Sequence, residues 1–126
     1  VKGEEWRTQK LVKELLAKYF TTKSDGIPGN DDAGTMSAWA IFSMMGFYPD
    51  IPGVPTYTVT TPTFDKVTIH LNKDYYPTDK MVIEVENPES PSDFIDTVKI
   101  GGRKSAYRIS HDDLVKGGMQ IRKKSE

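Results

Sequence analysis

The sequence GNDDAG at residues 29–34 runs directly into TMSAWAIFSMMGF at residues 35–47. Apolar residues cover nearly every face of a helix drawn over 35–47, so this stretch predicts a helix that is buried on all sides. The glycines of 29–34 permit sharp turns. The carboxylate and amide groups beside them offer oxygen ligands to a cation, or a base to a water molecule. The sequence therefore predicts a polar site at the start of a buried helix.

The residues on either side of this stretch predict an α+β chain. Apolar residues recur on one face from Glu4 to Phe20, which indicates an amphipathic helix, and the polar segment 21–34 reads as a loop. Beyond Pro52, alternation of apolar and polar residues predicts five or six short antiparallel strands. These lie at Tyr57–Thr61, Val67–Leu71, Met81–Val85, Phe94–Ile100, Ser105–Ile109 and Met119–Arg122.

Glycines and a capping serine predict where several elements end. Gly46 favours the end of the buried helix. Gly101-Gly102 predicts a tight hairpin between two strands. Ser110 is expected to cap a single helical turn that ends at Gly117-Gly118. The two histidines, His70 on the polar face of a strand and His111 in the capped turn, lie far apart in sequence and do not predict a zinc site.

Composition limits the classes of function. The 126 residues form one domain or a piece of a larger one, and the net charge of −1 gives no electrostatic case for nucleic-acid binding. No apolar run is long enough to predict a membrane span. The absence of cysteine excludes disulfides and thiolate chemistry.

The chain is expected to belong to something larger. It begins at Val1 within a helical pattern, with neither a methionine nor a secretion signal. Two helices and one sheet cannot cover every face of the helix over 35–47, and a large exposed apolar patch marks an interface.

The stretch 29–39, with Phe42-Ser43 and Gly46-Phe47-Tyr48-Pro49 after it, resembles the C-terminal region of the calcium-dependent exo-α-mannosidases of glycoside hydrolase family 92. The resemblance continues through residues 62–71, 109–114 and 116–118 and includes Thr8-Gln9-Lys10 upstream. It covers most of the chain in the right order.

This resemblance implies a domain organisation and partners. Residues 1–50 correspond to the terminal helices of a catalytic (α/α)₆ barrel, with the acidic active-site loop at 29–34. Residues 51–126 correspond to a C-terminal antiparallel β region, a sheet or sandwich layer. The partners would be the upstream barrel and the N-terminal domain of the same protein. The family's enzymes are typically exported by bacteria, so the resemblance implies a secreted, periplasmic or cell-surface location.

The resemblance also implies an activity, the inverting hydrolysis of terminal α-mannosides of glycans. A calcium ion binds two hydroxyls of the mannose and helps to distort its ring. Inversion needs one carboxylic acid and one carboxylate base. The resemblance assigns the base to Asp32, with Asp31 as second choice, and gives Asp32 and Asn30 as calcium ligands. The general acid and the main calcium ligands lie upstream, so the isolated chain is expected to be inactive.

Two other readings remain open. Residue types alone favour a helix cap at Asn30, Asp31 and Asp32, and one carboxylate can cap while its neighbour faces a ligand. Alternatively, the β region is a non-catalytic carbohydrate-binding or assembly module. Six aromatic residues are candidates for stacking on sugar in these readings: Trp6, Trp39, Tyr57, Tyr75, Tyr76 and Tyr107. The four tyrosines are scattered along the sequence, and the apolar neighbours of Trp39 favour a core position.

Overall fold

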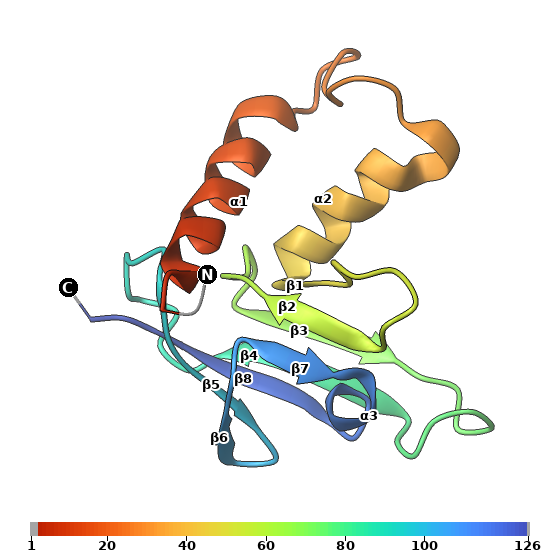
Figure 1. Cartoon of the computed structure of the whole chain (residues 1–126), viewed down its shortest axis with the longest axis vertical. Helices are drawn as coiled ribbons and strands as arrows, with labels where there is room; N and C mark the ends of the chain where they lie inside the picture. The colour runs from red at the N-terminus through yellow and green to blue at the C-terminus, as the bar shows by residue number, and fades with distance from the viewer. Residues whose placement is uncertain (1–2, 126) are drawn as a thin grey trace.

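The computed structural model describes residues 3–125, so the limits Val1 and Glu126 of the two expected regions lie outside it. Helices α1 and α2 lie together on one side of the strands (Figure 1). The elements are α1 (Glu5–Tyr19), η1 (Asp32–Gly34), α2 (Thr35–Met45), β1 (Phe47–Tyr48), β2 (Thr56–Val59), β3 (Lys66–His70), β4 (Lys80–Val85), β5 (Ile95–Ile100), β6 (Arg103–Ser105), β7 (Arg108–Ser110), α3 (His111–Leu114) and β8 (Gly118–Lys123). The expected α+β class is confirmed.

Helix α2 ends at Met45, and Gly46 follows it as the stop that the sequence predicted. Gly46 has a left-handed backbone (φ 93°) and donates its N–H to the carbonyls of Phe42 and Ser43. A Cβ atom at Gly46 would lie 2.6 Å from Cγ of Pro62, so a larger residue does not fit without a shift. The chain leaves the helix there, and Phe47–Tyr48 becomes β1 of a sheet.

The strands form two sheets. The smaller sheet has the order β1-β2-β7 and is antiparallel throughout. The larger has the order β3-β4-β8-β5-β6. In it β8 is antiparallel to β5 but parallel to β4, with Val82 opposite Gly118 and Val85 opposite Ile121. Because β4 and β5 run in opposite directions, a strand inserted between them must be parallel to one of them. The expectation of antiparallel pairing throughout is therefore wrong for this one pair.

The run predicted as one strand over 105–109 is divided between the two sheets. β6 pairs with β5 in the larger sheet, while β7 pairs with β2 in the smaller one. The hairpin is confirmed, since Gly101 and Gly102 both have positive φ, as a tight turn of the primed type requires. The capped turn is confirmed too, because Ser110 Oγ accepts a hydrogen bond from the N–H of Asp113 at 3.1 Å.

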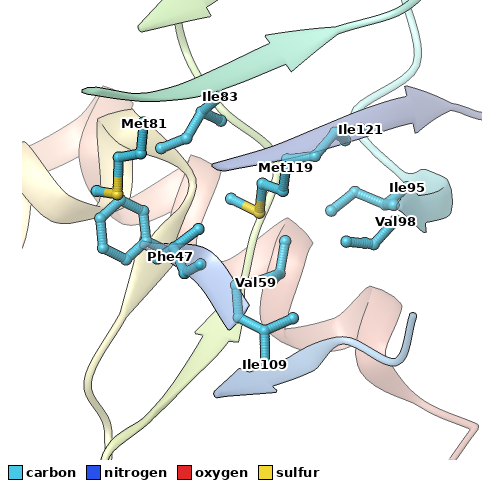
Figure 2. Packing of buried hydrophobic residues seen from close by; sticks show 10 residues of the cluster. Phe47, Val59, Met81, Ile83, Ile95, Val98, Ile109, Met119 and Ile121 are labelled. Atoms are coloured by element: carbon cyan, nitrogen blue, oxygen red, sulfur yellow. The ribbon is translucent and has the colours of Figure 1, made fainter. Parts of the chain in front are cut away.

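The core lies between the two sheets. Figure 2 shows Val59 and Ile109 of the smaller sheet facing Met119 and Ile121 of β8. Helix α1 is attached to the larger sheet by the buried side chain of Gln9, whose Oε1 accepts a hydrogen bond from the N–H of Ile95 at 3.1 Å. The remaining members of the cluster are Phe47, Met81, Ile83, Ile95, Val98 and Leu114.

The outward faces of the molecule differ in polarity. Ion pairs are formed by side chains of the larger sheet and its margin, such as Lys66–Glu84 at 3.1 Å and Lys99–Glu86 at 2.7 Å. Helix α1 also carries ion pairs, such as Lys10–Glu14 at 3.8 Å, but both helices expose apolar side chains as well, and Ile41 of α2 is 57% exposed. The expectation of a helix buried on all sides is thus not met within residues 3–125, whereas the expected surplus of apolar surface is present. None of the helices described is long and apolar enough to cross a membrane.

Candidate active site

The acidic loop 29–34 lies directly at the N-terminus of α2, and Asp31 closes that helix end. Its Oδ1 atom accepts hydrogen bonds from the N–H groups of Met36, at 2.8 Å, and Ser37, at 3.0 Å. Its Oδ2 atom accepts a third hydrogen bond, from the hydroxyl of Ser37. The hydroxyl and then the N–H of Ser37 lower the pKa of Asp31 below its ordinary value. Asp31 is therefore a cap whose charged form is favoured.

Asp32 is placed differently from its neighbour. Within residues 3–125 its exposed carboxylate has no hydrogen-bond or ion-pair partner. Its backbone carbonyl, in contrast, is held by the N–H and the hydroxyl of Thr35. The backbone of Asp32 is thus fixed while both side-chain oxygens remain available. A carboxylate in this state can accept a proton or bind a cation.

The backbone directly after the two acids has an unusual conformation. Ala33 has φ 52° and is the one described non-glycine residue with positive φ, and Gly34 follows with φ 76°. The left-handed region costs an alanine free energy, and such strain occurs often at functional sites. The side chain of Asp31 reaches past these two residues to the N–H groups of Met36 and Ser37.

The model of the glycosyl hydrolase family 92 catalytic domain matches residues 1–122. This chain belongs to glycosyl hydrolase family 92. The resemblance read from residues 29–39 and the later motifs is thereby confirmed.

The chain is similar to short parts of much longer proteins: it covers 16% of two solved structures and 8% of a curated relative. An inverting mannosidase of family 92 from Bacteroides thetaiotaomicron VPI-5482 is 32% identical, with a TM-score of 0.79, over 97% of this chain and 16% of that one. The fold also matches a family 92 α-mannosidase from Bacteroides thetaiotaomicron in complex with mannoimidazole, which is 23% identical, with a TM-score of 0.83, over 98% of this chain and 16% of that one. An uncharacterized secreted glycosidase from Arthroderma benhamiae is 37% identical over 60 residues, 48% of this chain and 8% of that protein.

The assignment of Asn30 and Asp32 as calcium ligands stays a prediction for this family 92 chain. Asn30 and Asp32 are both exposed and carry side-chain oxygens suited to the ion. Calcium takes six to eight oxygen ligands, however, and residues 3–125 contain no group of three or more His, Asp or Glu side chains that could hold an ion. The donor types of the loop suit calcium, but residues 3–125 do not form a complete site for it.

The two tryptophans have different surroundings. Trp39 stacks on Phe20, with ring centroids 5.4 Å apart, and borders an apolar pocket of about 290 Å³ with Met36 and Tyr19. Trp39 is half-buried and is not a member of the buried core cluster, so its expected core position stays a prediction. Trp6 is 44% exposed and meets the ring of Phe94 edge-on at 6.3 Å.

The tyrosines do not form a stacking platform. The hydroxyl of Tyr57 lies 2.8 Å from Nδ1 of His111, and the hydroxyl of Tyr107 donates to the carbonyl of Ile95 at 3.0 Å. Tyr75 is 81% exposed in the loop after β3. The contact between Tyr57 and His111 was not predicted from the sequence. The two residues are 54 positions apart, and no local sequence pattern indicates that they meet. Nothing in this arrangement favours the binding-module reading.

Proposed function

We propose that this chain is the C-terminal part of the catalytic domain of a calcium-dependent, inverting exo-α-mannosidase that acts on terminal α-mannosides of glycans. Residues 29–34 supply its general base. Membership of family 92 supports the hydrolase reading. The 32% identity to an inverting mannosidase over nearly the whole chain supports the substrate class and the stereochemistry.

Asp32 is assigned as the general base because its carboxylate has no partner among the described residues. A general base needs a free lone pair and a pKa that is not strongly depressed. Asp31 is the weaker candidate, because its oxygens already accept three hydrogen bonds, which lower its pKa and disfavour its taking up a proton. Asp32 stands beside it on a fixed backbone with both oxygens free. Asp32 therefore accepts the proton of the attacking water, and Asp31 positions the loop.

The rest of the site comes from outside this chain. In an inverting enzyme the second carboxyl group protonates the leaving oxygen from the opposite side, about 6.5–9.5 Å from the base. When bound, the calcium ion supplies positive charge that holds hydroxyls of the mannose. Asp32 and Asn30 contribute oxygen atoms at the edge of its coordination shell. A chain that lacks the acid and most of these ligands is inactive by itself.

The apolar faces of the helices indicate where the rest of the protein packs. Residues 1–50 form the terminal helices of the (α/α)₆ barrel, and residues 51–126 form the C-terminal β region. The exposed side chains of Leu11, Tyr19 and Ile41 lie on α1 and α2 and would be covered by upstream barrel helices. The upstream N-terminal domain completes the enzyme. Similarity to a secreted glycosidase supports action outside the cytoplasm.

The test is mannose release from an α-linked mannobiose by the complete protein that contains this chain. We expect activity that a calcium chelator abolishes and added calcium restores. Asp32→Asn is expected to lower kcat by about 10²- to 10⁴-fold. Asp25→Asn is the matched control, because Asp25 is an exposed acid of the same loop that has no described partner.

Each result has a defined meaning. Activity that survives Asp32→Asn moves the base to another residue. Equal losses for Asp32→Asn and Asp25→Asn would show a general effect of loop charge. If the complete protein releases mannose from no α-mannoside, the enzyme proposal fails and the binding-module reading replaces it.

A further inference from the structure

A polar cleft of about 480 Å³ lies between the β5–β6 turn and the segment that joins α3 to β8. In Figure 1 these two segments lie at the end of the molecule opposite to the start of α2. They form the cleft although they are distant in sequence. Arg103 and Lys116 bring two positive charges to its lining, and Asp113 brings one negative charge. The cleft thus has a net positive lining in a chain whose total charge is −1.

The cations of the cleft are available to a ligand. The guanidinium of Arg103 has no hydrogen bond or ion pair with any residue of the part that the structure describes. Lys116 approaches Asp113 only to 3.9 Å, and both side chains are more than half exposed. Such a pair contributes little stability and exchanges its partner readily.

Backbone donors add to the lining. Gly101 and Gly117 both line the cleft, and both have positive φ, at 55° and 148°. Their N–H groups donate to no acceptor within residues 3–125. Turn N–H groups together with cationic side chains are the usual donors to oxyanions in proteins.

The cleft also lies on the side of the larger sheet that faces water. Gln120 lines it and alternates with Met119 and Ile121, which are fully buried in the core. Its neighbour Lys99 across the β5–β8 pair is bonded to Glu86. Charged, ion-paired side chains therefore surround the cleft on this side of the sheet.

We propose that this cleft binds a tetrahedral oxyanion, phosphate or sulfate, either as the free ion or as an ester carried by a sugar. The planar guanidinium of Arg103 donates to two oxygens of the anion, and Lys116 and the turn N–H groups donate to the others. This site is separate from loop 29–34 and does not depend on the proposed activity.

Calorimetric titration of the complete protein with inorganic phosphate at low ionic strength tests the proposal. We expect saturable binding that weakens as salt is added. The double variant Arg103→Gln/Lys116→Gln is expected to bind about tenfold more weakly or worse. The control Lys104→Gln/Lys124→Gln removes the same charge from exposed positions outside the cleft and leaves binding unchanged.

Asp113→Asn is expected to raise the affinity for phosphate, whereas the double variant lowers it. It removes the one negative charge of the lining while an amide can still accept the bond from Ser110, so phosphate is expected to bind more tightly. A hexose phosphate, compared with inorganic phosphate and with the uncharged hexose, identifies the source of the anion. Tighter binding of the ester assigns a sugar-borne group, and equal binding assigns the free ion.

Three outcomes overturn the proposal. The first is no saturable binding of phosphate or sulfate. The second is an equal loss of affinity in the cleft variant and in the charge-matched control, which would mean attraction to net charge alone. The third is unchanged binding in Arg103→Gln/Lys116→Gln. None of these results bears on mannose release, so this proposal and the proposed function can fail separately.

Discussion

Asp31 is joined to Ser37 by two hydrogen bonds, one from the N–H to Oδ1 at 3.0 Å and one from the hydroxyl to Oδ2. The two residues lie on opposite sides of the left-handed turn at Ala33 and Gly34. Their contact caps the N-terminus of α2 and favours the charged form of Asp31. It also leaves Asp32 as the free carboxylate of the loop.

Replacing Asp31 with asparagine is expected to make stability less dependent on pH. The pKa of Asp31 in the folded protein lies below its ordinary value of 3.8, so its stabilising contribution is complete above 3.8 and disappears as the pH falls through the lower folded value. Thermal unfolding should therefore show Asp31→Asn less stable than the wild type at neutral pH, with the gap closing in strong acid. Ser37→Ala keeps both N–H donors and should show a smaller gap. A gap that is constant with pH would mean that the charge of Asp31 does not matter.

Substitutions at the left-handed turn should have opposite effects at adjacent positions. Gly34→Ala is expected to lower the free energy of unfolding by about 1–2 kcal/mol. The cost comes from φ 76° alone, because a Cβ there would meet no atom within 4 Å. Ala33→Gly relieves the strain at φ 52° and should raise stability by up to about 1 kcal/mol, after the larger entropy of the unfolded glycine is counted. Urea denaturation measures both. A cost for Ala33→Gly equal to that for Gly34→Ala would contradict the assigned backbone.

The parallel pair of β4 and β8 should depend on the absence of a side chain at Gly118. A Cβ there would lie 1.9 Å from the carbonyl oxygen of Val82, so Gly118→Ala must push the two strands apart. We expect a loss of about 3 kcal/mol or more in the free energy of unfolding. Gly117→Ala is the matched control, because Gly117 also has positive φ but nothing lies within 4 Å of its Cβ position. Similar losses for both would show that backbone strain, not the contact with Val82, is the cause.

The outer face of α2 should be buried in the complete protein. Ile41 is 57% exposed within this chain and Tyr75 is 81% exposed. If upstream helices cover α2, Ile41→Ser in the complete protein should lower the free energy of unfolding by about 1.5–3 kcal/mol. Tyr75→Ser, in the loop after β3, should change it little. Thermal and urea unfolding measure both variants. If Ile41→Ser changes the free energy of unfolding as little as Tyr75→Ser does, the outer face of α2 is exposed to water in the complete protein.

The helices were predictable from the sequence because local patterns determine them. Apolar spacing located α1 to within one residue at each end, and the acidic cluster before α2 located the polar loop. Gly46 located the end of α2, because a glycine after an apolar helical run is a local stop signal. The residue types allowed one acid to cap the helix while its neighbour faces a ligand, but they did not identify Asp31 as the cap. The hydrogen bonds of Asp31 cross a turn in which Ala33 has a positive φ, a conformation that alanine rarely adopts.

The sequence predicted the positions of the strands more accurately than it predicted which strands pair. Alternation found most of the segments, but it carries no information on which strand is the neighbour. The parallel partnership of Val82 with Gly118 and the division of 105–109 between two sheets both arise from distant contacts. The Tyr57–His111 contact was missed for the same reason.

The central position of β8 has a consequence for how the chain acquires its fold. This strand is the last one in sequence, yet it lies between β4 and β5 in the larger sheet. During synthesis the β3–β4 and β5–β6 hairpins emerge first, and each then presents an edge with unpaired backbone groups. Only the arrival of residues 118–123 joins the two halves and closes the core around Met119 and Ile121. Shortening the chain within β8 would therefore leave two separate hairpins prone to aggregation, in place of a slightly weakened sheet.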